Sequence, residues 1–188
     1  MALFRDGLLK DRGVVLAGGV TGAVADALAG LGARVEVLPD DAVPAADSED
    51  GAGEWARAHA PLNAVVFDAA AAFASGGATA LAAALEQAWA AVREVATGAL
   101  IPGQGPGKVV LVGPRPDAGP MAEAARAGLE NLARTLSVEW ARYQITVTMV
   151  APSPATDDAL LAQLVAFLCS PGGEYLSGCR LELGAMAR

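Results

Sequence analysis

The chain has 188 residues and a formal net charge of −8, and 54% of its residues are hydrophobic. This length and apolar content suffice for one domain with its own core, and they exclude a largely disordered chain. The negative charge argues against nucleic acid or an anionic membrane surface as the main partner, because both attract clustered Lys and Arg.

Targeting and metal-binding signals are weak. No stretch approaches the roughly 20 uninterrupted apolar residues of a membrane span. The opening segment "MALFRDGLLKDRG" lacks the apolar run of a signal peptide. Cys169, Cys179 and the single histidine, His59, make neither a disulfide framework nor a metal site. We therefore expect a cytoplasmic protein with no membrane partner and no metal.

Short β-branched runs alternate with longer Ala- and Leu-rich amphipathic runs. The expected strands are Val14–Ala17, Arg34–Leu38, Ala64–Phe67, Lys108–Val112, Ile145–Val150 and Arg180–Leu183. The expected helices are Gly22–Leu31, Glu54–Ala60, Ala78–Thr97, Met121–Arg142 and Asp157–Leu168, the last with Thr156 or Asp157 as its N-cap. This alternation predicts the α/β class: a Rossmann-like, doubly wound, mostly parallel sheet of about six strands, in a single domain over residues 1–188.

The first unit, residues 14–38, is a strand, a glycine-containing turn, a helix and a strand. Glycines there let a backbone approach a pyrophosphate at a helix N-terminus, so Gly18 and Gly22 are candidate cofactor-binding residues. The acidic segment Pro39–Gly53 follows and is predicted to be a loop. A solvated loop is the favoured explanation of Asp40 and Asp41, and a contact of either residue with ribose hydroxyls is the alternative.

The two long helices, 78–97 and 121–142, carry more apolar residues than one core face requires. In the second helix an apolar stripe recurs at i+3 and i+4 spacing and predicts core packing; it comprises Met121, Ala125, Leu129, Leu132, Leu136 and Trp140. Small residues around Gly128 allow close approach of another helix. We expect a subunit interface on these helices that includes Trp89, Val92, Gly128, Leu132 and Leu136.

Four pieces of the sequence resemble the short-chain dehydrogenase/reductase family, in particular its 3-oxoacyl-carrier-protein-reductase-like members. The pieces, which together span most of the chain, are "VVLAGGVTGAVADALAGLGARV", "LNAVVFDAA", "RAGLENLARTLSVEWARYQITVTMVAPSP" and "LVAFLCSPGGEYLSGCRLELGA". The resemblance implies a Rossmann-like sheet and an ancestry in NAD(P)-linked redox chemistry. Two segments are shortened relative to the family: residues 39–63, and the substrate-covering loop between residues 152 and 157.

The residues that the family uses for catalysis are missing. The resemblance implies a Tyr that moves a proton at the substrate oxygen, a Lys four residues later, a Ser and an Asn. Here Ala122 occupies the Tyr place, Arg126 the Lys place and Pro114 the Ser place. The only tyrosines are Tyr143 and Tyr175, and no lysine follows Lys108, so a Tyr-x-x-x-Lys pair is impossible. Arg126 is expected to be a solvent-facing charge, although a ribose contact is the alternative.

The cofactor motif is eroded as well. Val24 replaces the third glycine, Asp68-Ala69-Ala70-Ala71 replaces the family's NNAG stretch, and Ser153 replaces the glycine of its PG turn. Gly18, Gly22 and Asp40 are therefore expected to be remnants of a binding site. We expect NAD(P) binding to be weak or nil.

Three functions compete at this point. The first is a non-catalytic subunit that assembles with itself or with an active short-chain dehydrogenase/reductase paralogue through its long helices. The second is an NAD(P)-linked oxidoreductase with a non-standard site, for which the candidate acid–base residues are His59, Asp68, Tyr143, Tyr175, Cys169 and Cys179. The third is a module that senses nucleotides without turning them over.

Overall fold

Six parallel strands form a sheet in the order β2-β1-β3-β4-β5-β6 in the computed structural model, which describes residues 4–20, 22–42, 52–73 and 77–184. The strands are β1 (Gly13–Gly18), β2 (Arg34–Val37), β3 (Ala64–Asp68), β4 (Gly107–Val112), β5 (Ile145–Pro152) and β6 (Cys179–Leu183). All five strand pairs are parallel, so the expected sheet is confirmed. Each strand lies within two residues of its predicted bounds.

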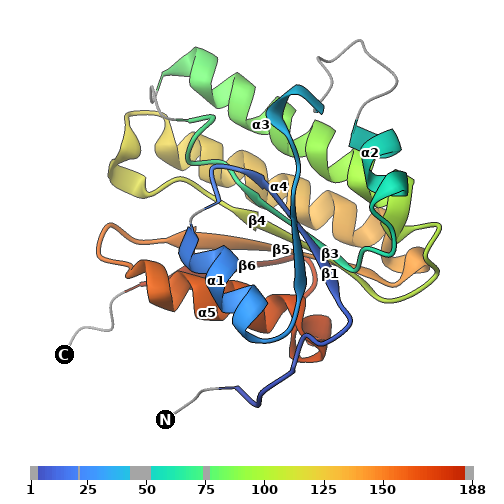
Figure 1. The fold of residues 1–188 in the computed structure, drawn as a ribbon. Helices are drawn as coiled ribbons and strands as arrows, with labels where there is room; N and C mark the ends of the chain where they lie inside the picture. Colours follow the sequence, from blue (N-terminus) through green and yellow to red (C-terminus); the bar gives the residue numbers. More distant parts are fainter. Residues whose placement is uncertain (1–3, 21, 43–51, 74–76, 185–188) are drawn as a thin grey trace.

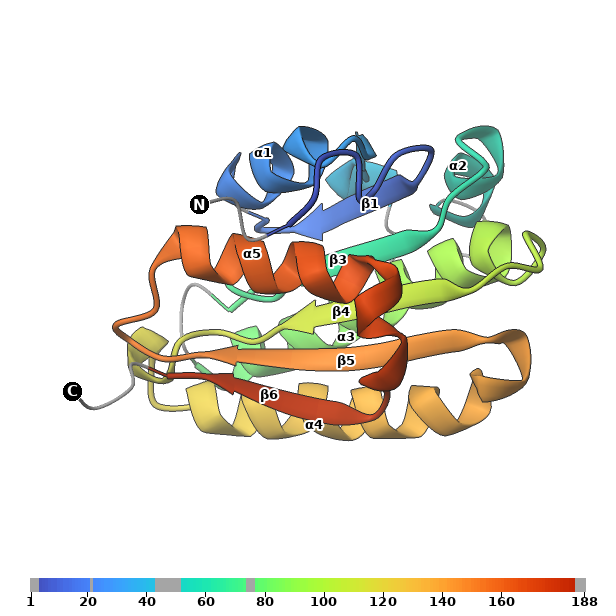
Figure 2. The same ribbon diagram turned by 90° about the horizontal axis from the view of Figure 1, so that it is seen from below.

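Helices cover both faces of the sheet (Figure 1). They are α1 (Gly22–Gly30), α2 (Ala52–Ala58), α3 (Ala78–Val95), α4 (Ala122–Glu139) and α5 (Asp158–Cys169). Helices α1 and α5 lie on one face, and α2, α3 and α4 lie on the other (Figures 1 and 2). None of the helices in the described part of the chain is both long and apolar enough to cross a membrane.

Two hydrophobic cores result from this layering. The larger lies between the sheet and α2, α3 and α4 and contains Phe67, Val109 and Leu129. The smaller lies under α1 and α5 and contains Val66 and Val110. Strands β3 and β4 are buried on both faces, which explains why their sequences are continuous apolar runs rather than alternating ones.

The helix ends differ from the sequence expectation. A π-helical turn, Ala96–Leu100, follows α3, and the short 3₁₀ helix Ala141–Tyr143 follows α4, so both long helices end earlier than predicted. Of the two expected N-caps for α5, Asp157 is the one observed: its side chain accepts a hydrogen bond from the Ala159 backbone N–H at 2.7 Å.

The segment between β2 and β3 adds no strand among the residues that the structure describes. It contains a 3₁₀ turn, Asp40–Ala42, and the two-turn helix α2. Residues 43–51 of the predicted acidic loop lie outside the described residues. Strand β2 is therefore an outermost strand of the described sheet.

The turn after β1 is shaped by close contact with the end of β3. Gly18 has φ of +72°, and a Cβ atom there would lie 2.3 Å from the Asp68 carbonyl oxygen. The next residue, Gly19, donates its N–H to that same oxygen at 3.0 Å. Gly22, the first residue of α1, has no atom within 4 Å of its Cβ direction. The first glycine is thus required by the fold itself, whereas the second is not.

We therefore expect Gly18→Ala to lower the free energy of unfolding by about 2 kcal/mol or more, because it adds backbone strain and a clash with the Asp68 carbonyl. Gly22→Ala is the matched control and should change stability by less than about 1 kcal/mol. Urea denaturation followed by circular dichroism measures both variants. Equal losses for the two would contradict this account of the turn.

Candidate functional site

The strand order marks one side of the sheet as the expected place of a ligand-binding crevice. The chain passes from β1 to β2 in one direction and then returns to β3 on the other side of β1, so the winding reverses between β1 and β3. In open parallel sheets ligands bind at the carboxyl ends of strands beside such a reversal. We call the side of the sheet where the strands end the carboxyl edge, and the side where they begin the amino edge. The arrowheads in Figure 2 point to the carboxyl edge.

The glycine turn forms one side of this crevice. Gly22 leaves open space at the start of α1, and Asp40 is exposed just beyond the end of β2. The side chain of Asp41 lies outside the described residues. Val24 is buried in the core under α1. Gly18, Gly22 and Asp40 therefore all lie at the carboxyl edge. The space beside Gly18 is already occupied by the carbonyl oxygen of Asp68.

Asp68, the last residue of β3, carries a buried carboxyl group at this edge of the sheet. Burial raises its pKa from 3.8 to about 6; a hydrogen bond from the Ala70 N–H and the charge of Arg115 oppose this shift, and Asp158 adds to it. The side chain accepts the Ala70 N–H at 2.8 Å. This carboxyl group can exchange a proton near neutral pH, and it stands where the resemblance implies an asparagine.

Arg126 is the main difference between the sequence expectation and the structure. It was expected to face solvent, but only 3% of it is exposed. Its Nη1 donates to the carbonyl oxygens of Pro114, at 2.9 Å, and Pro152, at 2.8 Å. Its Nη2 lies 3.1 Å from the Glu182 carboxylate. The guanidinium therefore joins α4 to the carboxyl ends of β4 and β5 and to β6.

The periodicity of α4 explains this burial and could have revealed it. The buried positions of α4 are Ala122, Ala125, Arg126, Leu129, Ala133 and Leu136. Arg126 falls on the stripe 122, 126, 129, 133 and 136, which follows i+4 and i+3 steps. The predicted stripe was shifted toward Met121 and Leu132, which are exposed and partly exposed respectively. A charged residue on a buried stripe is the signal that the sequence analysis missed.

Arg115 forms a second link across the same edge. Its Nη1 donates to the Ser153 carbonyl oxygen at 2.7 Å, and its Nη2 lies 3.0 Å from the Asp158 carboxylate at the start of α5. The segment after β4 is thereby tied to the segment after β5. Arg115 was not predicted to be a site residue, because the local sequence gives no sign of contacts with residues about forty positions away.

The other candidate acid–base residues lie at the amino edge. Asp68 alone among the six ends a strand at the carboxyl edge. The 3₁₀ helix that contains Tyr143 immediately precedes β5, and the 3₁₀ helix Pro171–Tyr175 precedes β6. The remaining candidates occupy equivalent places at strand starts or helix ends: His59, Cys169 and Cys179. Both tyrosines are thus separated from the crevice by the length of the sheet.

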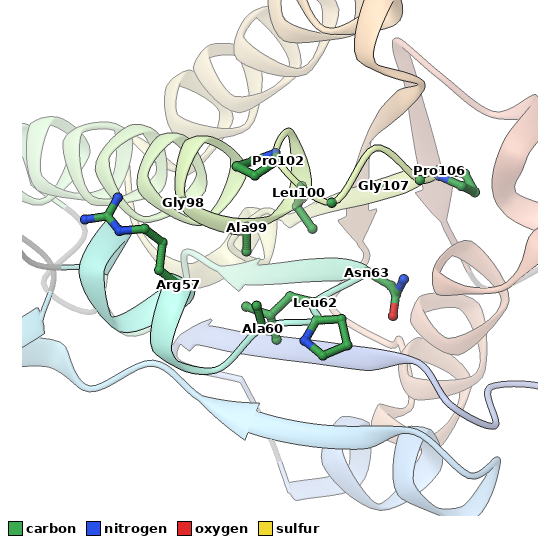
Figure 3. Close-up of a pocket in the computed structure, with 13 residues that line it drawn as sticks. Arg57, Ala60, Leu62, Asn63, Gly98, Ala99, Leu100, Pro102, Pro106 and Gly107 are labelled. Atoms are coloured by element: carbon green, nitrogen blue, oxygen red, sulfur yellow. The ribbon is translucent and has the colours of Figure 1, made fainter.

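A pocket of about 490 Å³ also opens at the amino edge (Figure 3). It lies between the segment before β3, the π-helical turn and the glycine- and proline-rich segment before β4. Arg57 and Asn63 lie at its opposite ends. The Asn63 side-chain oxygen already accepts the Gly13 N–H at 2.9 Å. This pocket has no acid–base pair and is remote from Asp68. No cluster of three metal-ligating side chains occurs among the described residues.

The structure corrects the expected interface. Val92 and Leu136 are fully buried in the larger core, so they pack within the chain. Gly128 permits the approach of α3 in the same chain, since a Cβ there would lie 2.7 Å from a Leu85 methyl carbon. Trp89 is exposed and Leu132 is partly exposed. Of the five predicted interface residues, Trp89 and Leu132 therefore still offer apolar surface to a partner.

No protein-family model matches the sequence, and no curated protein does. Solved structures do match. The citronellol catabolism dehydrogenase AtuB of Pseudomonas aeruginosa shares 22% identity, with 97% of each chain covered and a TM-score of 0.75. A hydroxysteroid dehydrogenase from Escherichia coli shares 15% identity over 97% of this chain and 99% of its own, with a TM-score of 0.73.

A third match is the E. coli protein BdcA, whose structure contains NADPH. It shares 17% identity over 96% of this chain and 98% of its own, with a TM-score of 0.72. These similarities establish the fold: the chain has the fold of the short-chain dehydrogenases/reductases. Similarity at this level of identity shows the fold alone, so the chemistry of the site must be inferred from the residues of this chain.

Arg126→Met should lower the free energy of unfolding by about 2–4 kcal/mol, because it leaves two buried carbonyl oxygens without a donor. Arg134→Met is the control: Arg134 lies on the exposed face of the same helix and pairs with Glu130, so its loss should cost less than about 0.5 kcal/mol. Urea denaturation gives both values. Similar small losses would show that the guanidinium is not a tertiary link.

The buried Asp68 carboxyl group should make stability fall as pH rises. Its folded-state pKa of about 6 exceeds the ordinary 3.8, so the folded state binds more protons between these values. From pH 4 to pH 7 this group should therefore cost about 2 kcal/mol. Asp68→Asn should flatten the pH profile, whereas the exposed Asp40→Asn should leave it unchanged. Urea unfolding from pH 4 to 8 measures the slope, and an unchanged slope in Asp68→Asn would contradict the assignment.

Proposed function

We propose that the chain is a non-catalytic subunit with the short-chain dehydrogenase/reductase fold, which assembles with itself or with an active paralogue. The observation that carries the proposal is the state of Arg126. It occupies the place that the resemblance gives to the catalytic lysine, and its Nη1 and Nη2 atoms donate to Pro114, Pro152 and Glu182. A side chain held this way is a tertiary link, and it has no free donor for a ribose hydroxyl on Nη1.

The chemistry of carbonyl reduction supports the same proposal. In the mechanism that the resemblance implies, a ketone oxygen that becomes a hydroxyl takes a proton from a donor within hydrogen-bond reach, and a nearby cation lowers the donor's pKa. Ala122 stands at the donor's place and is buried at the start of α4. Both tyrosines belong to elements at the amino edge, and Tyr175 is 90% exposed there. The crevice holds one titratable candidate, Asp68, without a second group in a known catalytic arrangement with it.

Assembly is supported by the outer surface of α3 and α4. Four apolar side chains of α3 and α4 remain outside the core, and we refer to them together as the outer patch: Trp89, Ala127, Leu132 and Val138. Trp89 and Ala127 are exposed, Leu132 is partly exposed, and Val138 is 78% exposed. These side chains are the apolar surface that α3 and α4 could offer to a partner.

A nucleotide-sensing module is the second candidate. The open space at Gly22 and the exposed Asp40 favour it, and the fold neighbour BdcA is found with NADPH. Two observations argue against it. The Asp68 carbonyl oxygen occupies the space beside Gly18, and Arg115 bonds to both Ser153 and Asp158 at the carboxyl edge. We therefore expect NAD(P) to bind weakly if it binds at all.

The deciding experiment combines light scattering, calorimetry and an activity assay. The wild-type chain, alone or mixed with an intact short-chain dehydrogenase encoded beside it, should elute above monomer mass. Ala127→Glu should shift this assembly toward monomer, because a carboxylate buried without a partner is costly. Ala29→Glu, on the exposed side of α1, is the matched control. Gly128→Glu is unsuitable, since it would clash with Leu85 inside the monomer.

The purified chain should not oxidise NADH or NADPH in the presence of 3-oxoacyl thioesters or ketones. A wild-type chain that stays monomeric alone and with the paralogue overturns the subunit proposal. Turnover that follows the protein peak and disappears in Asp68→Asn would establish an enzyme with a non-standard site. Low-micromolar NAD(P) binding without turnover would establish the sensing module.

A further inference from the structure

Lys108 is a buried cation at the amino edge of the sheet. It is the second residue of β4, between Ala64 of β3 and Thr146 of β5, and only 5% of it is exposed. Its Nζ has no hydrogen-bond partner among the described residues. Buried polar groups are nearly always hydrogen-bonded, so a buried ammonium that has an ion-pair partner in Glu174 but no hydrogen-bond acceptor is a costly exception. The position therefore calls for an acceptor.

The charges around Lys108 leave room for an anion. The Oε1 atom of Glu174 lies 3.8 Å from Nζ, which is too far for a hydrogen bond. Burial lowers the pKa of Lys108, Glu174 partly offsets this, and the positive charge of Arg12 lowers the pKa further. Burial raises the pKa of the adjacent Cys169 thiol to about 12, so the thiol is neutral at physiological pH. Glu174 and Arg12 are thus the charged side chains that act on Lys108.

A pocket of about 440 Å³ lies beside this lysine, between the C-terminal end of α4, the starts of β4 and β5, and the segment before β6. Its lining contains one cationic side chain, one acidic side chain and several neutral polar ones. The polar lining residues are Lys108, Glu174, Ser137, Gln144, Thr146 and Ser177. Hydroxyl and amide groups around a single ammonium suit a small organic acid better than a hydrocarbon.

We propose that this pocket binds a small monocarboxylate whose carboxylate accepts hydrogen bonds from Lys108 Nζ in place of Glu174. Glu174 currently covers Nζ, but its side chain is 44% exposed and makes only the long contact at 3.8 Å, so it can turn toward solvent. A monoanion balances the local charge. A phosphate dianion would add excess negative charge beside Glu174, so it should bind more weakly.

This site is independent of the proposed function. It lies at the amino edge, whereas the crevice with Asp68 and Arg126 lies at the carboxyl edge. A subunit without catalysis could therefore still bind a small acid here. The site also differs from the pocket in Figure 3, which lies between α2 and the π-helical turn.

The test is calorimetric and thermal-shift titration of the full chain with sodium acetate and sodium lactate, at ionic strength held constant with chloride. Wild type should bind and be stabilised. Lys108→Met, which keeps the length and loses the charge, should lose the response. Glu174→Gln removes the competing carboxylate and should lower the Kd about tenfold. Lys10 is the other lysine of the sequence and is exposed, so Lys10→Met should behave as wild type.

The opposite changes expected of Lys108→Met and Glu174→Gln separate binding from a purely structural role. If Lys108→Met does not fold, the Glu174→Gln variant still decides. The proposal is overturned if neither acid stabilises wild type beyond the chloride control, or if Glu174→Gln does not bind more tightly than wild type. Phosphate binding as tight as acetate binding would also overturn it, because the site would then be a general anion site.

Discussion

The carboxyl edge of this protein is organised around one buried guanidinium. Arg126 reaches from α4 to the carbonyl oxygens of Pro114 and Pro152, at the ends of β4 and β5, and to Glu182 on β6. Carbonyl oxygens at strand ends need donors, and an arginine supplies several in a fixed fork. These contacts tie α4, β5 and β6 and the segment after β4 together at this edge.

The chemistry-bearing residues are divided between the two edges of the sheet. The crevice at the reversal of strand order retains a glycine turn, Asp68 and two arginines that are engaged in internal contacts. The tyrosines, the cysteines, the histidine and Lys108 gather at the amino edge, which in parallel sheets is seldom the ligand-binding side. The length of the strands separates Asp68 from both tyrosines, so these groups do not share one site.

The outer patch on α3 and α4 and the buried stripe of the same helices must be distinguished, because only the first is available to a partner. Sequence periodicity marks apolar residues without saying how many faces of a helix are covered. Here α3 and α4 pack on the sheet and on each other, so Val92, Leu136 and Gly128 are used inside the chain. Trp89 and Val138 lie beyond this packing.

The sequence by itself determined the parallel sheet, the positions of the strands within two residues, and the absence of a Tyr-x-x-x-Lys pair. Periodicity and composition are local properties, and an absent residue type is absent in every fold. Only the tertiary structure decided the roles of Arg126, Asp68 and Lys108. Arg126 meets partners 12, 26 and 56 residues away, and the pKa of Asp68 depends on burial under segments distant in the chain. Burial and pairing of charges arise when such segments meet, so a linear pattern does not contain them.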